Sequence, residues 1–379
     1  MNGVEKEREM IRAAAAKTAE KIVLPRAAVI DATGEIPWDL VETFSKQGFL
    51  SLLLPEEYGG TNGDLTSFCS VVEEIAKVSG SASLLILAQG IGMLPILIGG
   101  SPFQKDKYFT QIAQENHLIA YTLSEPEWKW DATSIKTRGE KKEGDYLLNG
   151  RKDFITNGSI SHLYSAFVVT DPDREVEGIS AFVVEKGTPG LSFGKREEKL
   201  GMKGLVTTDV IFQNCRVPEA NRIGEEGEGW KIAMGTSHRS NPAVGALAVG
   251  IAQGALDYAI RYANERIQFG KPIASFQGIR FLIADMATQV EAARALVYKA
   301  VNQLDAQPEE SKKISAIAKC FASEVAMKVT TDAVQILGGY GYMRDYPVER
   351  MMRDAKVTQI YEGPNQIQRL WIAHQLIKS

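Results

Sequence analysis

The sequence is poor in the side chains that most often bind metals or form disulfides. Its 379 residues include 3 cysteines and 4 histidines. Cys69, Cys215 and Cys320 form no CxxC pair, and no two histidines have the HxxxH spacing of a helical metal site. We therefore expect neither a disulfide framework nor a metal centre, and we expect a reducing compartment.

The chain also lacks an excess of positive charge and an apolar N-terminal segment. Its 43 Lys and Arg against 47 Asp and Glu give a net charge of -4, which provides no basic field for nucleic acid. The start, MNGVEKEREM, has neither the apolar core of a signal peptide nor the Arg-rich character of a transit peptide. These features predict a cytoplasmic protein, or one of an organelle matrix after processing.

No known phosphate loop is present. The chain has no GK[ST] loop, Gly224 to Gly229 lies among acidic residues, and Gly338 to Gly341 follows a predicted helix rather than a strand. A nucleotide would have to be bound by other residues. Arg266 with Gln268 is a candidate, because Arg presents a planar fork to phosphate. The alternative is that Arg266 interacts only with a helix C-terminus.

Charge is missing over one long stretch. No charged residue occurs between Lys77 and Lys105, and Ser81 to Gly100 is almost wholly apolar. That length would admit a membrane span, but its glycines, Gln89 and Pro95 favour a helix buried on all sides in a bundle. Its small residues could leave space for an apolar ligand, with Leu87 and Ile91 facing it.

The order of hydrophobic periods predicts three domains. Residues 1–117 have helical periods, residues 118–227 contain short β-branched and aromatic runs, and residues 228–379 return to long helical periods. The fold class is therefore α+β, mainly α, with an N-terminal helical domain, a middle antiparallel β-barrel or sandwich, and a C-terminal four-helix bundle. The predicted strands are Leu118–Ser124, Tyr146–Asn149, Asp153–Asn157, Leu163–Thr170, Ile179–Glu185 and Val206–Phe212.

Local signals set the predicted boundaries. Asn149-Gly150 is typical of a hairpin turn between two strands. Asn241 followed by Pro242 is typical of an N-cap and first helical residue, so we expect a helix from there to about Ile267. Further helices are expected over Gln277–Leu304 and Ser311–Leu337.

Glu362 is the candidate catalytic residue. In Ile360-Tyr361-Glu362-Gly363-Pro364 the proline interrupts one helix and can begin the next, which we expect over Pro364 to Lys378. A carboxylate held in such a short connection could act as a general base. The alternative is that Glu362 only favours the positive end of the helix dipole.

Long motifs along essentially the whole chain resemble the acyl-CoA dehydrogenase family. They are YTLSEP (Tyr121–Pro126), KDFITNG (Lys152–Gly158), ISAFVVEKGTPG (Ile179–Gly190), ERIQFGKPI (Glu265–Ile273), QILGGYGY (Gln335–Tyr342), YPVERMMRDAK (Tyr346–Lys356) and IYEG (Ile360–Gly363). The family's fold has the domain order predicted above. The resemblance implies FAD as cofactor, an acyl-CoA substrate, an electron-transferring flavoprotein as partner and a homotetramer, or at least a homodimer.

The resemblance also assigns site residues. The flavin ring is expected against Tyr121, Leu123, Ser124, Phe154, Ile155 and Thr156. The adenosine diphosphate half is expected at Arg266, Gln268, Phe269, Gln277, Gln335 and Gly339, shared across a subunit interface, with a last flavin contact at Gln366. Residues near the substrate are expected to be Trp130, Ser240, Asn241, Tyr361 and Gly363.

In the implied reaction Glu362 removes the α-proton of an acyl thioester while the β-hydride passes to flavin N5. The developing enolate is stabilised by the backbone N–H of the base and a ribityl hydroxyl. Some relatives carry the base at the position of Ser240, which has no carboxylate in this sequence. Glu362 is therefore the expected base.

Four departures from the family pattern bear on the substrate. Glu127-Trp128-Lys129-Trp130 replaces a small-residue loop, Asn241 replaces a common Arg, Pro364 replaces a Thr, and His374 replaces an Arg. They leave three alternatives open beside the dehydrogenase: an enoyl-thioester reductase, an oxidase acting on a cyclic, aromatic or carrier-bound acyl group, and an inactive scaffold.

Overall fold

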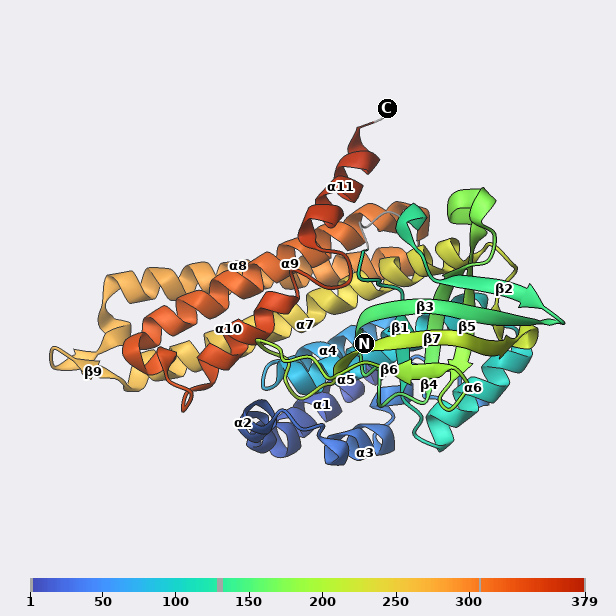
Figure 1. Cartoon of the computed structure of the whole chain (residues 1–379). Coiled ribbons are helices and arrows are strands. Elements are labelled where there is room, and N and C mark those ends of the chain that lie inside the picture. The colour runs from blue at the N-terminus through green and yellow to red at the C-terminus, as the bar shows by residue number, and fades with distance from the viewer. Residues whose placement is uncertain (1–2, 128–131, 307, 378–379) are drawn as a thin grey trace.

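Six helices form the N-terminal part of the protein (Figure 1). In this computed structural model, which describes residues 3–127, 132–306 and 308–377, they are α1 (Gly3–Thr18), α2 (Leu24–Thr33), α3 (Trp38–Lys46), α4 (Leu65–Ala76), α5 (Gly80–Gly99) and α6 (Pro102–Gln114). Side-chain caps begin three of them: Asp64 accepts from Ser67 N–H, Ser79 from Ala82 N–H, and Ser101 forms a capping box with Gln104. These caps explain why the helices begin where they do.

The uncharged segment forms α5, and its expected burial is confirmed. Both α5 and α7 (Gly229–Glu265) are long and apolar enough to cross a membrane. In each helix, however, 78% of the apolar 18-residue segment is buried inside the protein. At two glycines of α5 the neighbouring residues leave no spare space for a ligand. A Cβ on Gly90 would meet the Phe68 ring at 2.3 Å, and one on Gly92 would meet the Ile119 carbonyl oxygen at 2.7 Å. These glycines therefore permit close packing, and Leu87 and Ile91 are core residues.

The middle part is an eight-stranded sheet. Its strands are β1 (Ile119–Thr122), β2 (Arg138–Lys142), β3 (Asp145–Thr156), β4 (Leu163–Val169), β5 (Ile179–Glu185), β6 (Leu191–Phe193), β7 (Thr207–Pro218) and β8 (Arg222–Ile223). Their order is β6-β7-β3-β2-β4-β5-β8, with β1 paired to β4. Pairing is mainly antiparallel, as predicted, but β1 runs parallel to β4, and β2 meets β4 in parallel at Arg138 and Val169.

The predicted hairpin at Asn149-Gly150 is wrong, because β3 runs through it as one strand. Gly150 has φ +150° and lies at a shift in register against β7. A Cβ there would be 2.5 Å from Thr137 Oγ1. The glycine therefore allows a β-bulge and the close approach of the segment that contains Thr137. The neighbouring sequence does not distinguish this arrangement from a turn.

The C-terminal part contains three long helices and two shorter ones. They are α7, α8 (Gln277–Ala306), α9 (Pro308–Leu337), α10 (Pro347–Val357) and α11 (Asn365–Leu376), with a small hairpin of β9 (Ile267–Gln268) and β10 (Lys271–Pro272) after α7. In Figure 1 the three long helices run side by side, the hairpin lies at one end, and α11 projects away.

The predicted helix start at Asn241-Pro242 is also wrong. Helix α7 begins at Gly229, thirteen residues before Pro242, and Pro242 lies inside it. Proline in a helix interior leaves one carbonyl without its usual donor. The helix nevertheless continues because Ser240 and Asn241 are 1% and 0% exposed, so the residues before the proline are packed into the core.

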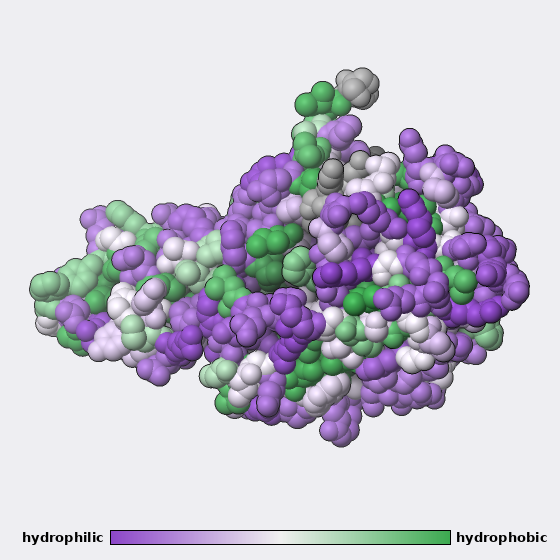
Figure 2. All heavy atoms as spheres, viewed as in Figure 1, coloured by the Kyte–Doolittle hydropathy of each residue, from purple (hydrophilic) through white to green (hydrophobic). Residues whose placement is uncertain are grey.

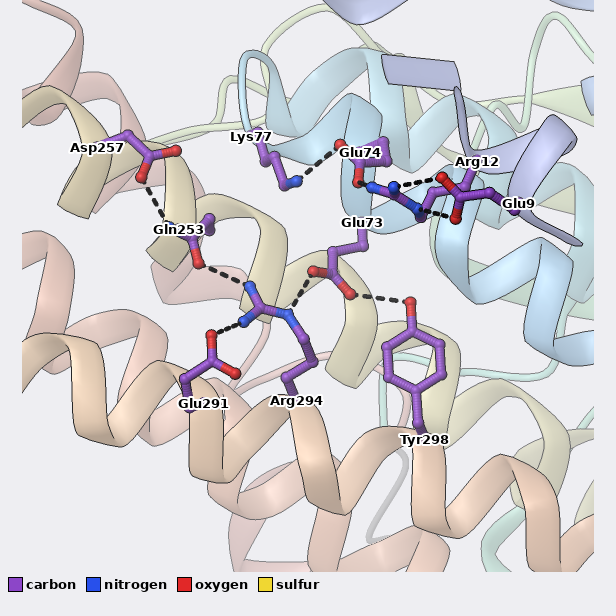
Figure 3. Close-up of polar contacts among 10 residues, drawn as sticks. All are labelled: Glu9, Arg12, Glu73, Glu74, Lys77, Gln253, Asp257, Glu291, Arg294 and Tyr298. Carbon is purple, nitrogen blue, oxygen red and sulfur yellow. Dashed lines mark hydrogen bonds and ion pairs between the residues drawn. The ribbon is translucent and has the colours of Figure 1, made fainter. Parts of the chain in front are cut away.

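Polar contacts join the N-terminal helices to the long helices (Figure 3). Glu73 on α4 accepts from Arg294 Nε at 2.8 Å and from Tyr298 Oη at 2.9 Å, both on α8. Arg294 Nη2 donates to Gln253 Oε1 on α7 at 2.7 Å. Nearby, Glu74 pairs with Lys77 and Arg12. This network fixes α4 against α7 and α8.

A second junction fixes α10. Arg353 pairs with Glu349 one turn earlier and also with Asp31 on α2 at 2.6 Å. The neighbouring Asp354 accepts from Met202 N–H at 2.6 Å. Because α10 leads directly into the Glu362 connection, these contacts determine where that connection begins.

Candidate active site

Glu362 lies in a sharp connection between α10 and α11. Glu362 and Gly363 have φ of 51° and 79°, so two successive residues are left-handed. That conformation is unfavourable for a glutamate and persists only where its surroundings hold it. Gln368 does so by donating from Nε2 to the carbonyl oxygens of Glu362 and Gly363, at 3.0 and 3.3 Å. The expected break is confirmed, with Pro364 as the N-cap of α11.

The Glu362 carboxylate has few partners. Ser240 Oγ, on α7, donates to Oε2 at 3.2 Å. Burial raises the pKa of Glu362 above its usual range, while the Ser240 hydrogen bond and the positive charge of Lys319 oppose that rise. A carboxylate with a raised pKa is a stronger base than an ordinary glutamate, as a general base requires.

Two tyrosines share this environment. Burial, reinforced by the negative charge of Glu362, raises the pKa of both Tyr121 and Tyr361. The carboxylate therefore lies near the end of β1, where Tyr121 is. Tyr361 Oη is buried and finds no hydrogen-bond partner in the described part of the chain. Glu362, Ser240, Tyr121, Tyr361 and Gly363 are thus brought together as predicted.

The segments expected to face a flavin ring also meet. Lys152 Nζ donates to the Leu123 carbonyl oxygen at 3.2 Å, and Asp153 N–H donates to the Ser124 carbonyl oxygen at 3.1 Å. These bonds place the end of β1 beside the Phe154, Ile155 and Thr156 end of β3. Phe154 has φ 53° and is 70% exposed, so its ring is uncovered. Uncovered apolar side chains beside strand-end hydroxyls fit a flat heteroaromatic ring.

A second group of predicted residues lies at the hairpin end of the long helices. Arg266, Gln268 and Gly339 line a cleft of about 440 Å³ together with Tyr262, Tyr340 and Met343. The Arg266 guanidinium lies over the Tyr340 ring at 5.2 Å, and no carboxylate of the described residues pairs with it. It is therefore free to bind an anion such as a pyrophosphate. Phe269, 92% exposed, belongs to the same end, as do Gln277 at the start of α8 and Gln335 near the end of α9.

The two groups are not brought together within one chain. In Figure 1 the β9 hairpin lies at one end of the long helices, while β1 and α11 lie toward the other. Gln366 is exposed on α11, near Glu362 in sequence. Asn241 is buried and donates to Gln368 Oε1 at 3.3 Å, so it supports the connection rather than lining an open site. Trp130 lies outside the described residues.

Three residues at the site were missed from the sequence. Gln368, Asn365 and Lys319 contact the backbone after Glu362 or one another. The first two are ordinary polar residues at a helix start, so no local pattern marks them. Lys319 did carry a signal, because it is a lysine within the apolar run ISAIAKCFA of a predicted core helix.

Comparison with known families agrees with this geometry. Three domain models match the chain in order: acyl-CoA dehydrogenase N-terminal domain over residues 5–116, middle domain over 120–215 and C-terminal domain over 227–377. The chain belongs to the acyl-CoA dehydrogenase family. An acyl-CoA dehydrogenase of Bacillus subtilis is 47% identical over 375 residues, 99% of each chain. A cyclohex-1-ene-1-carbonyl-CoA dehydrogenase of Syntrophus aciditrophicus is 46% identical, over 100% of this chain and 91% of the relative.

Solved structures of acyl-CoA dehydrogenases are similarly close. Butyryl-CoA dehydrogenase of Megasphaera elsdenii aligns with a TM-score of 0.95 at 40% identity, covering 100% of this chain and 99% of that one. An acyl-CoA dehydrogenase complexed with FAD, from Bacillus anthracis, aligns with a TM-score of 0.91 at 32% identity, over 98% of this chain and 66% of that one. A chain in a structure of electron transferring flavoprotein of Acidaminococcus fermentans aligns with a TM-score of 0.96 at 44% identity, over 100% and 99%.

This acyl-CoA dehydrogenase is therefore an FAD-dependent oxidoreductase, and its residues fit that cofactor. The uncovered Phe154 and the strand ends of β1 and β3 suit the flavin ring. Arg266, which pairs with no described carboxylate, suits the phosphates from its position in the cleft. In both places the side chains that would contact FAD are not occupied by other described residues.

Proposed function

We propose that this enzyme introduces a double bond between the α and β carbons of an acyl-CoA, with Glu362 as the base that removes the α-proton. The observation that carries the proposal is the position of the carboxylate. Its charge acts on Tyr121 at the end of β1, it accepts from one neutral hydrogen-bond donor, and its pKa is raised. Bound FAD would supply the acceptor for the β-hydride.

The backbone at Glu362 supports a second role. Among the described residues, no acceptor takes the Glu362 N–H, although Gln368 occupies its carbonyl oxygen. A free N–H beside the base can donate to the thioester oxygen as negative charge develops there during proton removal. The left-handed connection thus provides the base and a donor from a single residue.

We propose that the complete cofactor site forms between subunits, in at least a homodimer and by family resemblance a homotetramer. The flavin-ring residues and the Arg266 cleft lie at different ends of one chain in Figure 1. In Figure 2 apolar patches interrupt the polar surface at the hairpin end of the long helices and along the projecting α11. Exposed side chains there include Ile267, Phe269, Leu370 and Leu376. Burial of these residues against a second copy would explain their exposure in the single chain.

For the electron acceptor we propose an electron-transferring flavoprotein. The support is the 44% identity to a chain found in an electron transferring flavoprotein structure. Both straight and cyclic acyl groups belong in the test, because one relative at 46% identity is named for cyclohex-1-ene-1-carbonyl-CoA and a solved structure at 40% identity is a butyryl-CoA dehydrogenase.

The test is an anaerobic titration of the purified yellow protein with saturated straight-chain, cyclic and aromatic acyl-CoAs. We expect at least one to bleach the flavin, and the reduced enzyme to be reoxidised faster by an electron-transferring flavoprotein than by oxygen. If dithionite bleaches the flavin but no acyl-CoA does, the dehydrogenation proposal is wrong. Rapid reoxidation by oxygen alone would instead identify an oxidase.

A further inference from the structure

A buried lysine lies directly behind the base connection. Lys319, near the middle of α9, is 0% exposed. Burying an ammonium group is costly unless it is paired, and among the described residues no carboxylate is within ion-pair distance of Nζ. In contrast, Lys152, which is also 0% exposed, pairs with Glu125 at 2.7 Å. Packing alone gives no reason for a charge at Lys319.

The contacts of Lys319 point to the segment that carries Glu362. Its Nζ donates to the Gly363 carbonyl oxygen at 2.8 Å and to Asn365 Oδ1 at 3.0 Å. Asn365 is itself held by Ser323 Oγ, which accepts from Nδ2 at 2.9 Å. Gly363 is the second left-handed residue of the connection. Lys319 therefore ties the residue after the base, and the first residue of α11, to the long helix α9.

The negative charge of Glu362 acts on Lys319. Burial lowers the pKa of Lys319 to about 8, and the negative charge of Glu362 opposes that decrease. The positive charge of Lys319 in turn opposes the rise in the pKa of Glu362. The other titratable group facing Lys319 is the Cys320 thiol on α9, next to the Glu324 and Arg369 pair. From α7 the neutral Ser240 hydroxyl donates to the Glu362 carboxylate, and the neutral Asn241 amide contacts Gln368.

We propose that Lys319 is a positioning residue for Glu362: it holds the left-handed connection through the Gly363 carbonyl, and its ammonium charge favours the ionised carboxylate before proton transfer. This inference rests on the proposed role of Glu362 as base. It separates two contributions, one from a hydrogen bond and one from charge, and different substitutions remove them.

The test uses Lys319→Met, Lys319→Gln and the control Lys199→Met. Methionine removes both the donor and the charge, whereas glutamine keeps a donor for the Gly363 carbonyl and loses the charge. Lys199 is a matched control because it is also mostly buried, its pKa is also lowered to about 8, and it donates to the Leu205 carbonyl and Thr207 Oγ1, far from Glu362 in sequence. The rate of flavin bleaching by acyl-CoA is measured anaerobically across pH, together with the spectrum of the bound flavin and the thermal midpoint.

Both Lys319 variants are expected to move the acidic limb of the rate profile to higher pH, because Glu362 loses a charge that favours its ionised form. Above that limb Lys319→Met is expected to stay roughly 10- to 100-fold slow through misplacement of the base, while Lys319→Gln recovers toward wild type. Lys199→Met should leave the profile unchanged. If Lys319→Met does not fold, Lys319→Gln alone tests the shift.

An unshifted acidic limb in a folded, yellow Lys319 variant overturns the inference, as does an equal shift in Lys199→Met. Failure of the proposed function is distinguishable, because it would make Glu362→Gln bleach normally. Normal bleaching by the Lys319 variants with none by Glu362→Gln would leave the base in place and remove only the role of Lys319.

Discussion

Glu73 and Glu362 are both glutamates shielded by the protein, but their surroundings differ. Glu73 is 5% exposed, and its two oxygens accept from Arg294 and Tyr298 at 2.8 and 2.9 Å (Figure 3). Glu362 accepts one hydrogen bond from a neutral serine at 3.2 Å and forms no ion pair with any described residue. A carboxylate that joins two domains is fully satisfied, whereas one that must accept a proton is left with a raised pKa.

The difference predicts opposite responses to substitution, and the largest change in free energy is expected for Glu73→Ala. This substitution removes one of the two carboxylates that pair with the mostly buried Arg294 guanidinium, the other being Glu291, and breaking a buried pair costs at most about 3–5 kcal/mol. We expect that loss in chemical unfolding followed by fluorescence. Glu140→Ala, at an exposed position of β2, is the control and should unfold as wild type. Equal unfolding of the two variants would contradict the structural role of Glu73.

Tyr298→Phe removes one of the two donors to Glu73 and leaves Arg294 in place. A hydrogen bond to a charged group contributes about 1.5–3 kcal/mol, so the same unfolding measurement should show a smaller loss than Glu73→Ala. Tyr258→Phe is the matched control, because its ring stacks with Arg261 while its hydroxyl has no partner in the described structure. A loss as large in Tyr258→Phe would show that the hydroxyl bond to Glu73 is not the cause.

Ser240→Ala removes the hydrogen bond to Glu362. Since that bond favours the ionised carboxylate, its loss raises the pKa of Glu362 further, and the acidic limb of the bleaching rate moves to higher pH. We expect rates about 2- to 10-fold lower on that limb. Ser240→Thr keeps the hydroxyl and should keep the profile. An unchanged limb in Ser240→Ala would show that this bond does not affect the base.

Glu362→Gln should have the smallest effect on stability, and of opposite sign to Glu73→Ala. A carboxyl whose folded pKa is raised loses stability as pH rises from the unfolded pKa through the folded one. Glutamine does not titrate, so the variant lacks this loss of stability. It should be slightly more stable than wild type near neutral pH and equal to it at acidic pH. Unfolding midpoints across pH measure this. A variant less stable than wild type at neutral pH would place Glu362 with Glu73 as a structural carboxylate.

The sequence predicted the three-part order and the break at Glu362 because both rest on local chemistry, such as hydrophobic period and Pro364. The sequence-based prediction failed where one local pattern is compatible with two different structures. Asn241-Pro242 has the chemistry of a helix start, yet close packing carries α7 through it. Gly150 has the chemistry of a turn, yet Thr137 requires the glycine. The Lys319 contact with Gly363 joins residues 44 positions apart, so it could be identified only from the three-dimensional structure.

The most direct test of the central claim is the rate at which an acyl-CoA that reduces the wild-type flavin bleaches the flavin of Glu362→Gln under anaerobic conditions. With Glu362 as the base, the variant should bind FAD with an unchanged oxidised spectrum and bleach about 10²- to 10⁴-fold more slowly. Bleaching at the wild-type rate would contradict the assignment of Glu362.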